Sequence, residues 1–232
     1  ESRGVEQPKE HYWDVFNHLL ETVGVFERVI NGHERTGDTA LALLPWRSEI
    51  DDYFTTEVTA GHTRATLTKL ACLLHDIAKP STRTVESSGR IRFLGHHKVG
   101  AEKARRIMGR LRFSRRATDL VGRMVEHHLR PGQMAQEGEM PTARAVYRYF
   151  RDVGDAAIDT LYLNLADYLA ARGPELEVED WSEHCRVTEH ILQGRSSMPE
   201  VTHSPLLDGN EIMDEFSLAP GEHVGVLLEL VR

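Results

Sequence analysis

Helical periodicity is the feature that most constrains the fold of this chain. Apolar residues recur every three to four positions through most of it, which is the pattern of helices that bury one face. The segments with this pattern are 11–30, 63–78, 99–111, 114–129, 142–154, 155–171 and 178–193. The alternation typical of a strand is scarce, and its nearest instance is the short run Gly89–Gly95. The sequence therefore predicts an all-α fold, a bundle of helices.

Length and composition fit one large domain with a smaller appendage. The chain has 232 residues, of which 40% are hydrophobic and 28% charged, which is ordinary for a globular domain with a core. We expect a domain over residues 1–195 and a C-terminal extension over 196–232. No apolar run reaches 18 residues, so we expect no membrane span. The chain begins at Glu1, and its last helical pattern, at 221–232, lacks a stop signal. We therefore expect a fragment cut at both ends, with a truncated extension.

The two cysteines indicate the redox state of the compartment and include one candidate metal ligand. Cys72 and Cys185 cannot form a disulfide framework, which favours a reducing compartment and a cytoplasmic location. Cys72 lies one turn before His75 and could face a metal. The alternative, a small apolar side chain in a buried helix, is the more common role of such a cysteine.

Charge is unevenly distributed along the chain. The net charge of -8 argues against a protein that coats nucleic acid. Ten basic residues nevertheless stand against three acidic ones between Lys98 and Arg130. The basic residues are Lys98, Lys103, Arg105, Arg106, Arg110, Arg112, Arg115, Arg116, Arg123 and Arg130. This stretch suits contact with an RNA or DNA backbone, and an ordinary solvated helix face is an equally good interpretation.

Histidines and carboxylates occur at the ends of several predicted helices. The segment 63–78 is the most hydrophobic, so we expect it to be the central helix, and it ends on the adjacent His75 and Asp76. Asp167 lies in another apolar run, where a buried carboxylate costs several kcal/mol unless it is paired or metal-bound. Because Asn164 shares its helix face, a solvent-facing Asp167 stays an alternative. His18 lies in the first predicted helix, His96 opens a later one, and His127 and His128 close another.

Such residues, one or two from each of several helices, suit a metal centre in the core of a bundle. Imidazole and carboxylate groups bind borderline divalent ions such as Fe, Mn, Co, Ni and Zn, and Mg is a further candidate. A single tetrahedral zinc site needs only three or four ligands. The set is larger than that, so we expect two divalent metal ions that share a bridging carboxylate, of an identity that the sequence does not fix.

The order His18, His75-Asp76, Asp167, with Lys79 after the doublet, resembles the H…HD…D signature of the HD-domain metal-dependent phosphohydrolases. The resemblance covers most of the chain. The segments "YWDVFNH", "LLHDIAKP", "FLGHHKVGAEKARRIMGRLRFS" and "VEHHLRP" look like the HD domain that bacterial tRNA nucleotidyltransferases and poly(A) polymerases carry C-terminally. Residues 204–231 are similar to the segment that ends those proteins. The nucleotidyltransferase head of that family is not in this sequence.

The resemblance implies roles for individual residues. His18, His75, Asp76 and Asp167 would hold the first metal. Asp76 would bridge to a second metal that His96 and either His128 or His127 complete. Asp14 matches an acidic position that supplies a further ligand in some relatives, and a supporting or solvent-facing role is its alternative. The histidines that fit no ligand position, which we expect at the surface or in loops, are His11, His33, His62, His184, His190, His203 and His223.

The resemblance also implies a catalytic pair, Asp76 and Lys79, in which Lys79 contacts the substrate phosphate. Arg130 is a second candidate phosphate contact. An alternative role for Lys79 is to compensate the negative end of its helix.

The function implied is hydrolysis of a phosphomonoester or phosphodiester of a nucleotide or RNA end by a metal-activated water. Cyclic phosphodiesterase, 2′-nucleotidase and phosphatase activities all fit. The main alternative is a non-catalytic metal-containing accessory domain of a tRNA nucleotidyltransferase, which contacts tRNA through residues 98–130. A stand-alone nucleotide phosphohydrolase unrelated to tRNA is a third possibility, and the resemblance of the C-terminal segment "LLDGNEIM" counts against it.

Overall fold

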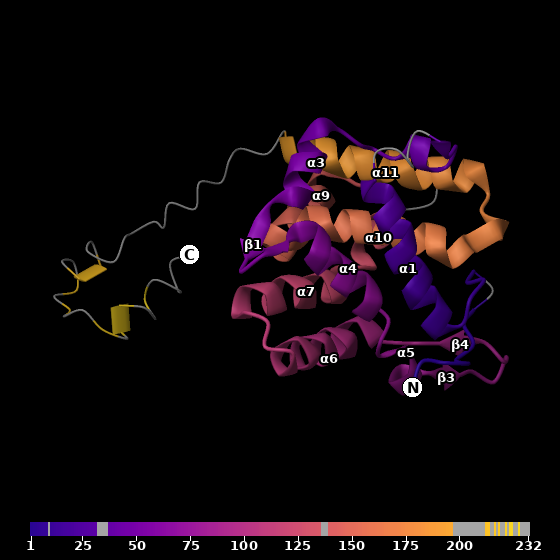
Figure 1. The fold of residues 1–232 in the computed structure, drawn as a ribbon, viewed down its shortest axis with the longest axis horizontal. Coiled ribbons are helices and arrows are strands. Elements are labelled where there is room, and N and C mark those ends of the chain that lie inside the picture. The colour runs from indigo at the N-terminus through magenta and orange to yellow at the C-terminus, as the bar shows by residue number, and fades with distance from the viewer. Residues whose placement is uncertain are drawn as a thin grey trace. The chain divides into compact units, whose positions relative to one another are not determined.

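The computed structural model describes residues 1–8, 10–31, 37–135 and 139–196, together with isolated residues between 212 and 227. The chain divides into two units, Glu1–Arg195 and Ser196–Arg232, and the first unit is the helical domain of Figure 1. The C-terminal helix expected at 221–232 and the resemblance of 204–231 fall almost wholly outside the described residues.

Helices make up most of the first unit, and the predicted all-α fold is confirmed. They are α1 (Val15–Ile30), α3 (Ser48–Thr55), α4 (Arg64–Leu74), α5 (Lys79–Thr82), α6 (His96–Arg110), α7 (Arg115–His127), α8 (Arg130–Met134), α9 (Ala143–Val153), α10 (Ala157–Arg172) and α11 (Val178–Ser196). Single 3-10 turns are η1 (Leu41–Leu43), η2 (Gly154–Ala156) and η3 (Gly173–Glu175). Helices α3, α5 and α8 were not predicted, because they are too short to show a clear period.

Within the described residues, four short strands form two antiparallel hairpins. The first pairs β1 (Glu57–Thr59) with β2 (His62–Thr63), and the second pairs β3 (Thr84–Val85) with β4 (Ile91–Arg92). Strand β4 falls within the run Gly89–Gly95 that carried the nearest strand pattern. The second hairpin lies near α5 and the N-terminus of the chain (Figure 1).

Side-chain caps fix where the main helices begin. In each case a side-chain oxygen accepts a hydrogen bond from the backbone N–H three residues on, which satisfies a donor that the helix leaves free. The capping residues are Asp14 for α1, Thr63 for α4, Ser114 for α7 and Thr142 for α9. The cap at Thr63 sets the start of α4, and three turns later the helix ends with His75 at its C-terminal boundary.

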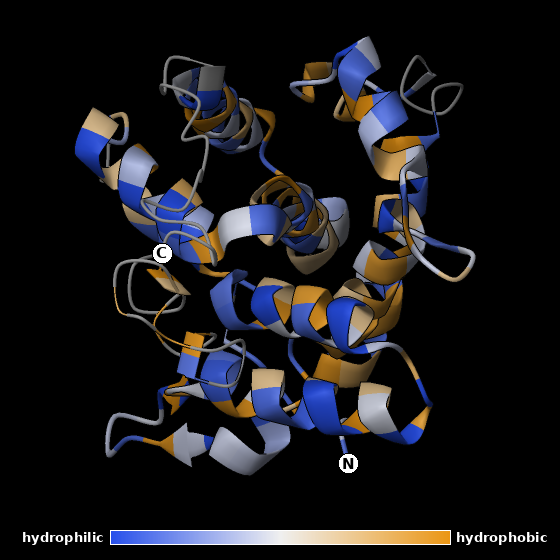
Figure 2. Ribbon diagram, turned by 90° about the vertical axis from the view of Figure 1, so that its left-hand side faces the viewer, coloured by the Kyte–Doolittle hydropathy of each residue, from blue (hydrophilic) through white to orange (hydrophobic). Residues whose placement is uncertain are grey.

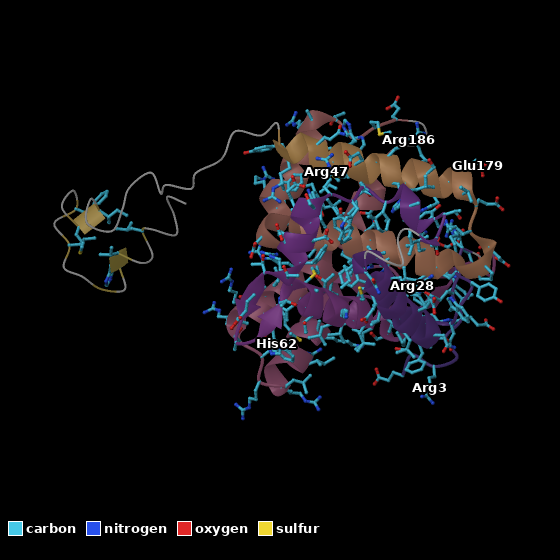
Figure 3. All side chains as sticks on the ribbon, turned by 45° about the horizontal axis from the view of Figure 1, so that its top comes forward. Arg3, Arg28, Arg47, His62, Glu179 and Arg186 are labelled. Carbon is cyan, nitrogen blue, oxygen red and sulfur yellow. The ribbon has the colours of Figure 1, made fainter. Side chains whose placement is uncertain are left out.

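Helices α1, α4, α7 and α10 pack against one another and form the core. Hydrophobic residues gather on the helices at the centre of the domain (Figure 2), whereas charged side chains such as those of Glu179 and Arg186 project from α11 (Figure 3). Helix α4 contacts α1, α7 and α10, as expected of a central helix. Helix α10 is buried more completely, along 13 of its 16 residues, because its polar residues find partners inside the domain.

One of those polar residues, Asp159, is the acceptor of a buried hydrogen-bond network. Asp159 is 0% exposed and Arg64 is 6% exposed. Oδ2 of Asp159 lies 2.6 Å from Nη1 of Arg64 and accepts a hydrogen bond of 2.5 Å from the hydroxyl of Tyr53. The hydroxyl of Thr68 lies 3.3 Å from Oδ1. The network ties α10 to α3 and α4, so it fixes the position of the helix that carries Asp167.

We expect Asp159→Ala to lower the free energy of unfolding by about 3 kcal/mol, because it removes the buried carboxylate partner of Arg64 and leaves only the 58% exposed Asp155 to balance its charge. Urea unfolding followed by circular dichroism measures this change. The matched control is Asp119→Ala, since Asp119 pairs with Arg115 at the surface, where the two side chains are 56% and 98% exposed. Equal unfolding midpoints for the two variants would show that the network adds no stability.

Among the described residues, no helix is both long enough and apolar enough to cross a membrane, as the sequence led us to expect.

Candidate metal centre

Five helices bring six histidine and aspartate side chains together inside the domain. The first group of possible metal ligands is His18, His75, Asp76 and Asp167, and the second is Asp76, His96 and His128. Within each group, one ligand atom per residue lies within 4.8 Å of all the others. Asp76 belongs to both groups, so it joins them into a single cluster.

In the first group, ring nitrogens face carboxylate oxygens across short distances. Nε2 of His18 lies 2.9 Å from Oδ1 of Asp167, and Nε2 of His75 lies 3.4 Å from the same oxygen. Oδ2 of Asp76 lies 3.3 Å from Nε2 of His75 and 3.6 Å from Nε2 of His18. The two Nε2 atoms are 3.3 Å apart.

In the second group, the other oxygen of Asp76 faces two histidines. Oδ1 lies 3.1 Å from Nε2 of His96 and 3.6 Å from Nε2 of His128. Those two ring nitrogens are 3.4 Å apart. Each oxygen of Asp76 therefore faces one of the two groups.

The backbone determines which ring nitrogens point into the cluster. Nδ1 of His75 lies 2.8 Å from the carbonyl oxygen of Cys72, Nδ1 of His96 lies 2.7 Å from that of Phe93, and Nδ1 of His128 lies 2.7 Å from that of Val125. A carbonyl oxygen only accepts hydrogen bonds, so Nδ1 carries the proton in each neutral ring. The lone pair of each Nε2 is thereby turned toward the cluster, as in metal-binding histidines.

Local structure explains why the same contact recurs. His75 and His128 directly follow α4 and α7, where the last carbonyl groups have no helical partner. His96 opens α6 after Gly95, whose φ of 75° lies in the left-handed region that favours glycine. Each ring thus bonds to the carbonyl three residues before it.

These residues fit a divalent cation. His18, His75, Asp76 and His128 are at most 2% exposed. Oδ1 of Asp76 is buried, and no described residue gives it a hydrogen bond of good geometry. Two Nε2 lone pairs that face one another at 3.3–3.4 Å repel unless a proton or a metal ion lies between them. Imidazole and carboxylate ligands together suit Fe, Mn, Co, Ni and Zn.

The electrostatics of the cluster also favour positive charge at its centre. Burial raises the pKa of Asp76, but Lys79 and His75 outweigh it and hold that pKa well below its usual value. The pKa of Asp167 is lowered in the same way, chiefly by His75 and His18. Burial lowers the pKa of His75, yet the two carboxylates outweigh burial and raise it to about 10. Two ionised carboxylates in a buried site require a proton or a metal ion beside them.

Lys79 is held tightly beside Asp76. Its Nζ lies 2.6 Å from Oδ2 of Asp76, 2.6 Å from Oε1 of Gln7 and 3.3 Å from Nε2 of His11. An ammonium group has three N–H donors, so each has an acceptor. Lys79 therefore adds a positive charge to the site, but all three of its N–H donors are already used within the protein.

A cleft of about 550 Å³ opens onto the cluster and is lined by Asp76, His96, His128 and Asp167. Its cationic lining residues are Lys79, Arg90, Arg92 and Arg172. One wall comes from the N-terminal segment through Pro8, Glu10 and His11. A cleft with this lining favours an anionic ligand.

The structure places some predicted residues away from the cluster. It brings His128 into the second group and leaves His127 outside both groups, because the next residue along the chain points in a different direction. Arg130 pairs with Asp152 at 2.8 Å and does not line the cleft. Asp14 caps α1, and the buried Cys72 belongs to neither group.

Other residues of the site were missed by the sequence analysis. His11, expected at the surface or in a loop, lines the cleft, and burial, then Lys79 and His18, lower its pKa to about 3. Arg90 and Arg92 lie two apart around β4, so the strand pattern could have suggested that they share a face. No pattern in the sequence marked Arg172 as a residue of the site. His184, also expected at the surface, stacks on Tyr168 with ring centroids 4.3 Å apart, whereas His33 and His203 lie outside the described residues.

Comparison with known proteins agrees with this geometry. The profile of the HD domain family matches residues 15–172. The chain is 37% identical over 163 residues to a CC-adding tRNA nucleotidyltransferase of Thermus thermophilus, which covers 69% of this chain and 34% of that protein. It is 30% identical over 231 residues to an A-adding tRNA nucleotidyltransferase of Deinococcus radiodurans, covering 98% of this chain and 44% of the relative.

A more distant relative is a bifunctional uridylyltransferase/uridylyl-removing enzyme of Cupriavidus metallidurans, which is 32% identical over 111 residues. That match covers 47% of this chain and 12% of the relative. The chain thus spans less than half the length of each of these relatives.

The region matched by the family profile contains both groups of possible ligands. Its first group has the order His18, His75-Asp76, Asp167 on which the predicted resemblance depended. The resemblance to the tRNA nucleotidyltransferases is likewise confirmed by two relatives of that kind. The chain therefore belongs to the HD domain family.

Proposed function

We propose that this domain is a metal-dependent phosphohydrolase that acts on a phosphomonoester or phosphodiester of a nucleotide or RNA end. The observation that carries the proposal is the position of the cluster, which opens onto a cleft lined by Lys79, Arg90, Arg92 and Arg172. The ligand set suits divalent cations, and the cationic lining suits the phosphate groups of the substrate. The relatives are named as tRNA nucleotidyltransferases and as a uridylyltransferase/uridylyl-removing enzyme. These names support a nucleotide or RNA substrate.

We propose that His18, His75, Asp76 and Asp167 hold one ion and that Asp76, His96 and His128 hold a second. The chemistry that such ions supply is activation of a water molecule and neutralisation of the phosphoryl charge. Lys79 keeps Asp76 ionised and in place through its contact of 2.6 Å. The side-chain amide of Asn164 donates to the carbonyl of His128 at 3.0 Å. Its Oδ1 is buried beside the cleft and has no partner within the described part of the chain. That oxygen can accept a hydrogen bond from a water molecule or a substrate hydroxyl.

We expect the chain to bind two equivalents of Mn²⁺ and His128→Gln to bind one, because the second group loses a ligand while the first stays intact. Elemental analysis after dialysis measures the stoichiometry. His127→Gln is the matched control, since His127 is the adjacent histidine outside both groups, and it should keep two equivalents. A single equivalent in the unaltered chain would exclude the two-ion proposal.

We expect the metal-loaded chain to hydrolyse at least one member of a panel of phosphomonoesters, phosphodiesters and cyclic nucleotides with Mn, Ni, Co or Mg. Asp76→Asn should lower kcat/KM more than about a hundredfold, since loss of a partner to a metal ligand already costs 10–100-fold. EDTA should abolish the activity. Thermal unfolding checks that the variant still folds. If the loaded chain hydrolyses nothing, the non-catalytic accessory domain becomes the better interpretation.

A second function, contact with tRNA, is favoured by the surface of α6 and α7. These helices pack side by side, and their exposed cations are Lys98, Arg106, Arg110, Arg112, Arg115, Arg116 and Arg123. Among the described residues, Arg106, Arg110, Arg112 and Arg116 have no ion-pair partner. His96 and His128 lie at the opposite end of this helix pair. The turn between α6 and α7 is therefore about 20 Å from the cluster, so one RNA molecule can contact both.

We expect Arg110→Gln/Arg116→Gln to weaken tRNA binding and to flatten its salt dependence by roughly one log unit per lost phosphate contact. Filter binding at several salt concentrations measures both changes. Arg47→Gln/Arg186→Gln removes the same charge from the residue before α3 and from α11, both labelled in Figure 3, and should have little effect. Equal losses in both double variants would point to net charge alone and exclude a specific surface.

A further inference from the structure

His11 is a cleft residue with one engaged ring nitrogen and one free ring nitrogen. Its Nε2 lies 3.3 Å from Nζ of Lys79. Its Nδ1 is buried and finds no hydrogen-bond partner among the described residues, although the residue lines the cleft. A buried polar atom without a partner costs about 1–3 kcal/mol, so it calls for an explanation.

The contact with Lys79 determines the tautomer of His11. An ammonium group has donors only, so Nε2 of His11 must accept. Lys79 is in turn oriented by Oδ2 of Asp76 and Oε1 of Gln7, each 2.6 Å from Nζ. The proton of the neutral ring therefore lies on Nδ1, which makes the unpartnered atom an N–H donor.

The segment that carries His11 is fixed at several points. The backbone N–H of His11 donates to the carbonyl of Pro8 at 3.0 Å, and that of Tyr12 donates to the carbonyl of Ala171 at 2.8 Å. Nη1 of Arg172 donates to the carbonyl of Glu10 at 2.7 Å. The ring meets that of His18 edge to face, with centroids 5.3 Å apart. A donor held in this way is oriented before any ligand binds.

We propose that Nδ1–H of His11 donates a hydrogen bond to a non-bridging oxygen of the bound phosphoryl group, so that His11 is a phosphate-binding residue of this site. The proposal rests on the proposed function. The neighbouring cationic lining of the cleft attracts an anionic oxygen, and such an oxygen satisfies the free donor. Because all three donors of Lys79 are engaged, its charge reaches the phosphate through His11, which it polarises.

Two substitutions separate the two nitrogens of the ring. The amide of Asn overlaps the Nδ1 side of an imidazole, so His11→Asn keeps the proposed donor and loses the acceptor for Lys79. The amide of Gln reaches the Nε2 position, so His11→Gln keeps the acceptor and loses the donor. His11→Leu removes both.

The test is the affinity of the Mn²⁺-loaded chain for inorganic phosphate, measured by titration calorimetry. We expect His11→Asn to bind phosphate within about threefold of the unaltered chain. His11→Gln and His11→Leu should bind it roughly 10–100-fold more weakly, the effect of one hydrogen bond to a charged group. His62→Asn, which changes a histidine packed on Phe113 away from the cleft, should not alter the affinity.

The opposite order, with Gln retaining affinity and Asn losing it, would assign His11 the role of positioning Lys79 and would overturn the proposal. Equal affinities in all variants, or no phosphate binding by the unaltered chain, would also overturn it. The metal content of each variant shows whether the substitution disturbs the neighbouring His18 and thereby metal binding. A loss of Mn²⁺ from His11→Asn contradicts the proposal. A last outcome is that phosphate affinity follows the expected order among the variants while the unaltered chain hydrolyses no phosphoester. In that case His11 keeps its role and the phosphohydrolase proposal fails.

Discussion

The site depends on one buried carboxylate, that of Asp76. It is 2% exposed, and a charge in that position is tolerated only with close positive partners. Lys79 supplies one such partner at 2.6 Å. His75, also buried, lies 3.3 Å from the same oxygen, while the other oxygen faces His96 and His128 without a good hydrogen bond. Asp76 is therefore compensated on one side, and its second side is left for a cation.

The adjacency of His75 and Asp76 follows from how α4 ends. His75 turns back so that Nδ1 reaches the carbonyl of Cys72 at 2.8 Å, which points Nε2 toward α1 and α10. Asp76 is the next residue, and its Oδ1 faces His96 of α6 and His128 at the end of α7. The same contact recurs at the end of α7, where Nδ1 of His128 reaches the carbonyl of Val125. Carbonyl groups at the ends of these two helices thus set the tautomers of His75 and His128.

The sequence was sufficient for the all-α fold and for the order of the possible ligands, since helical period and residue type are local properties. It could not decide between His127 and His128, because a step of one residue changes direction by about 100° and only the packed position of α7 selects one. It also missed His11, Arg90 and Arg172. They reach the cleft from an N-terminal segment, a short hairpin and a helix end, which no periodic pattern marks.

The missed residues share a function that the predicted ligands do not have. The histidines and carboxylates of the cluster can hold cations, but two carboxylates beside a phosphate would repel it. Arg90, Arg92 and Arg172, together with the predicted Lys79, place four positive charges along the cleft, which offset its carboxylates. His11 adds a neutral donor where the donors of Lys79 are used up. In the proposed site, metal ligands and substrate contacts would thus come from different parts of the chain. Packed helices and their ends would supply the first, and the N-terminal segment, a hairpin and the end of α10, which backbone hydrogen bonds hold together, would supply the second.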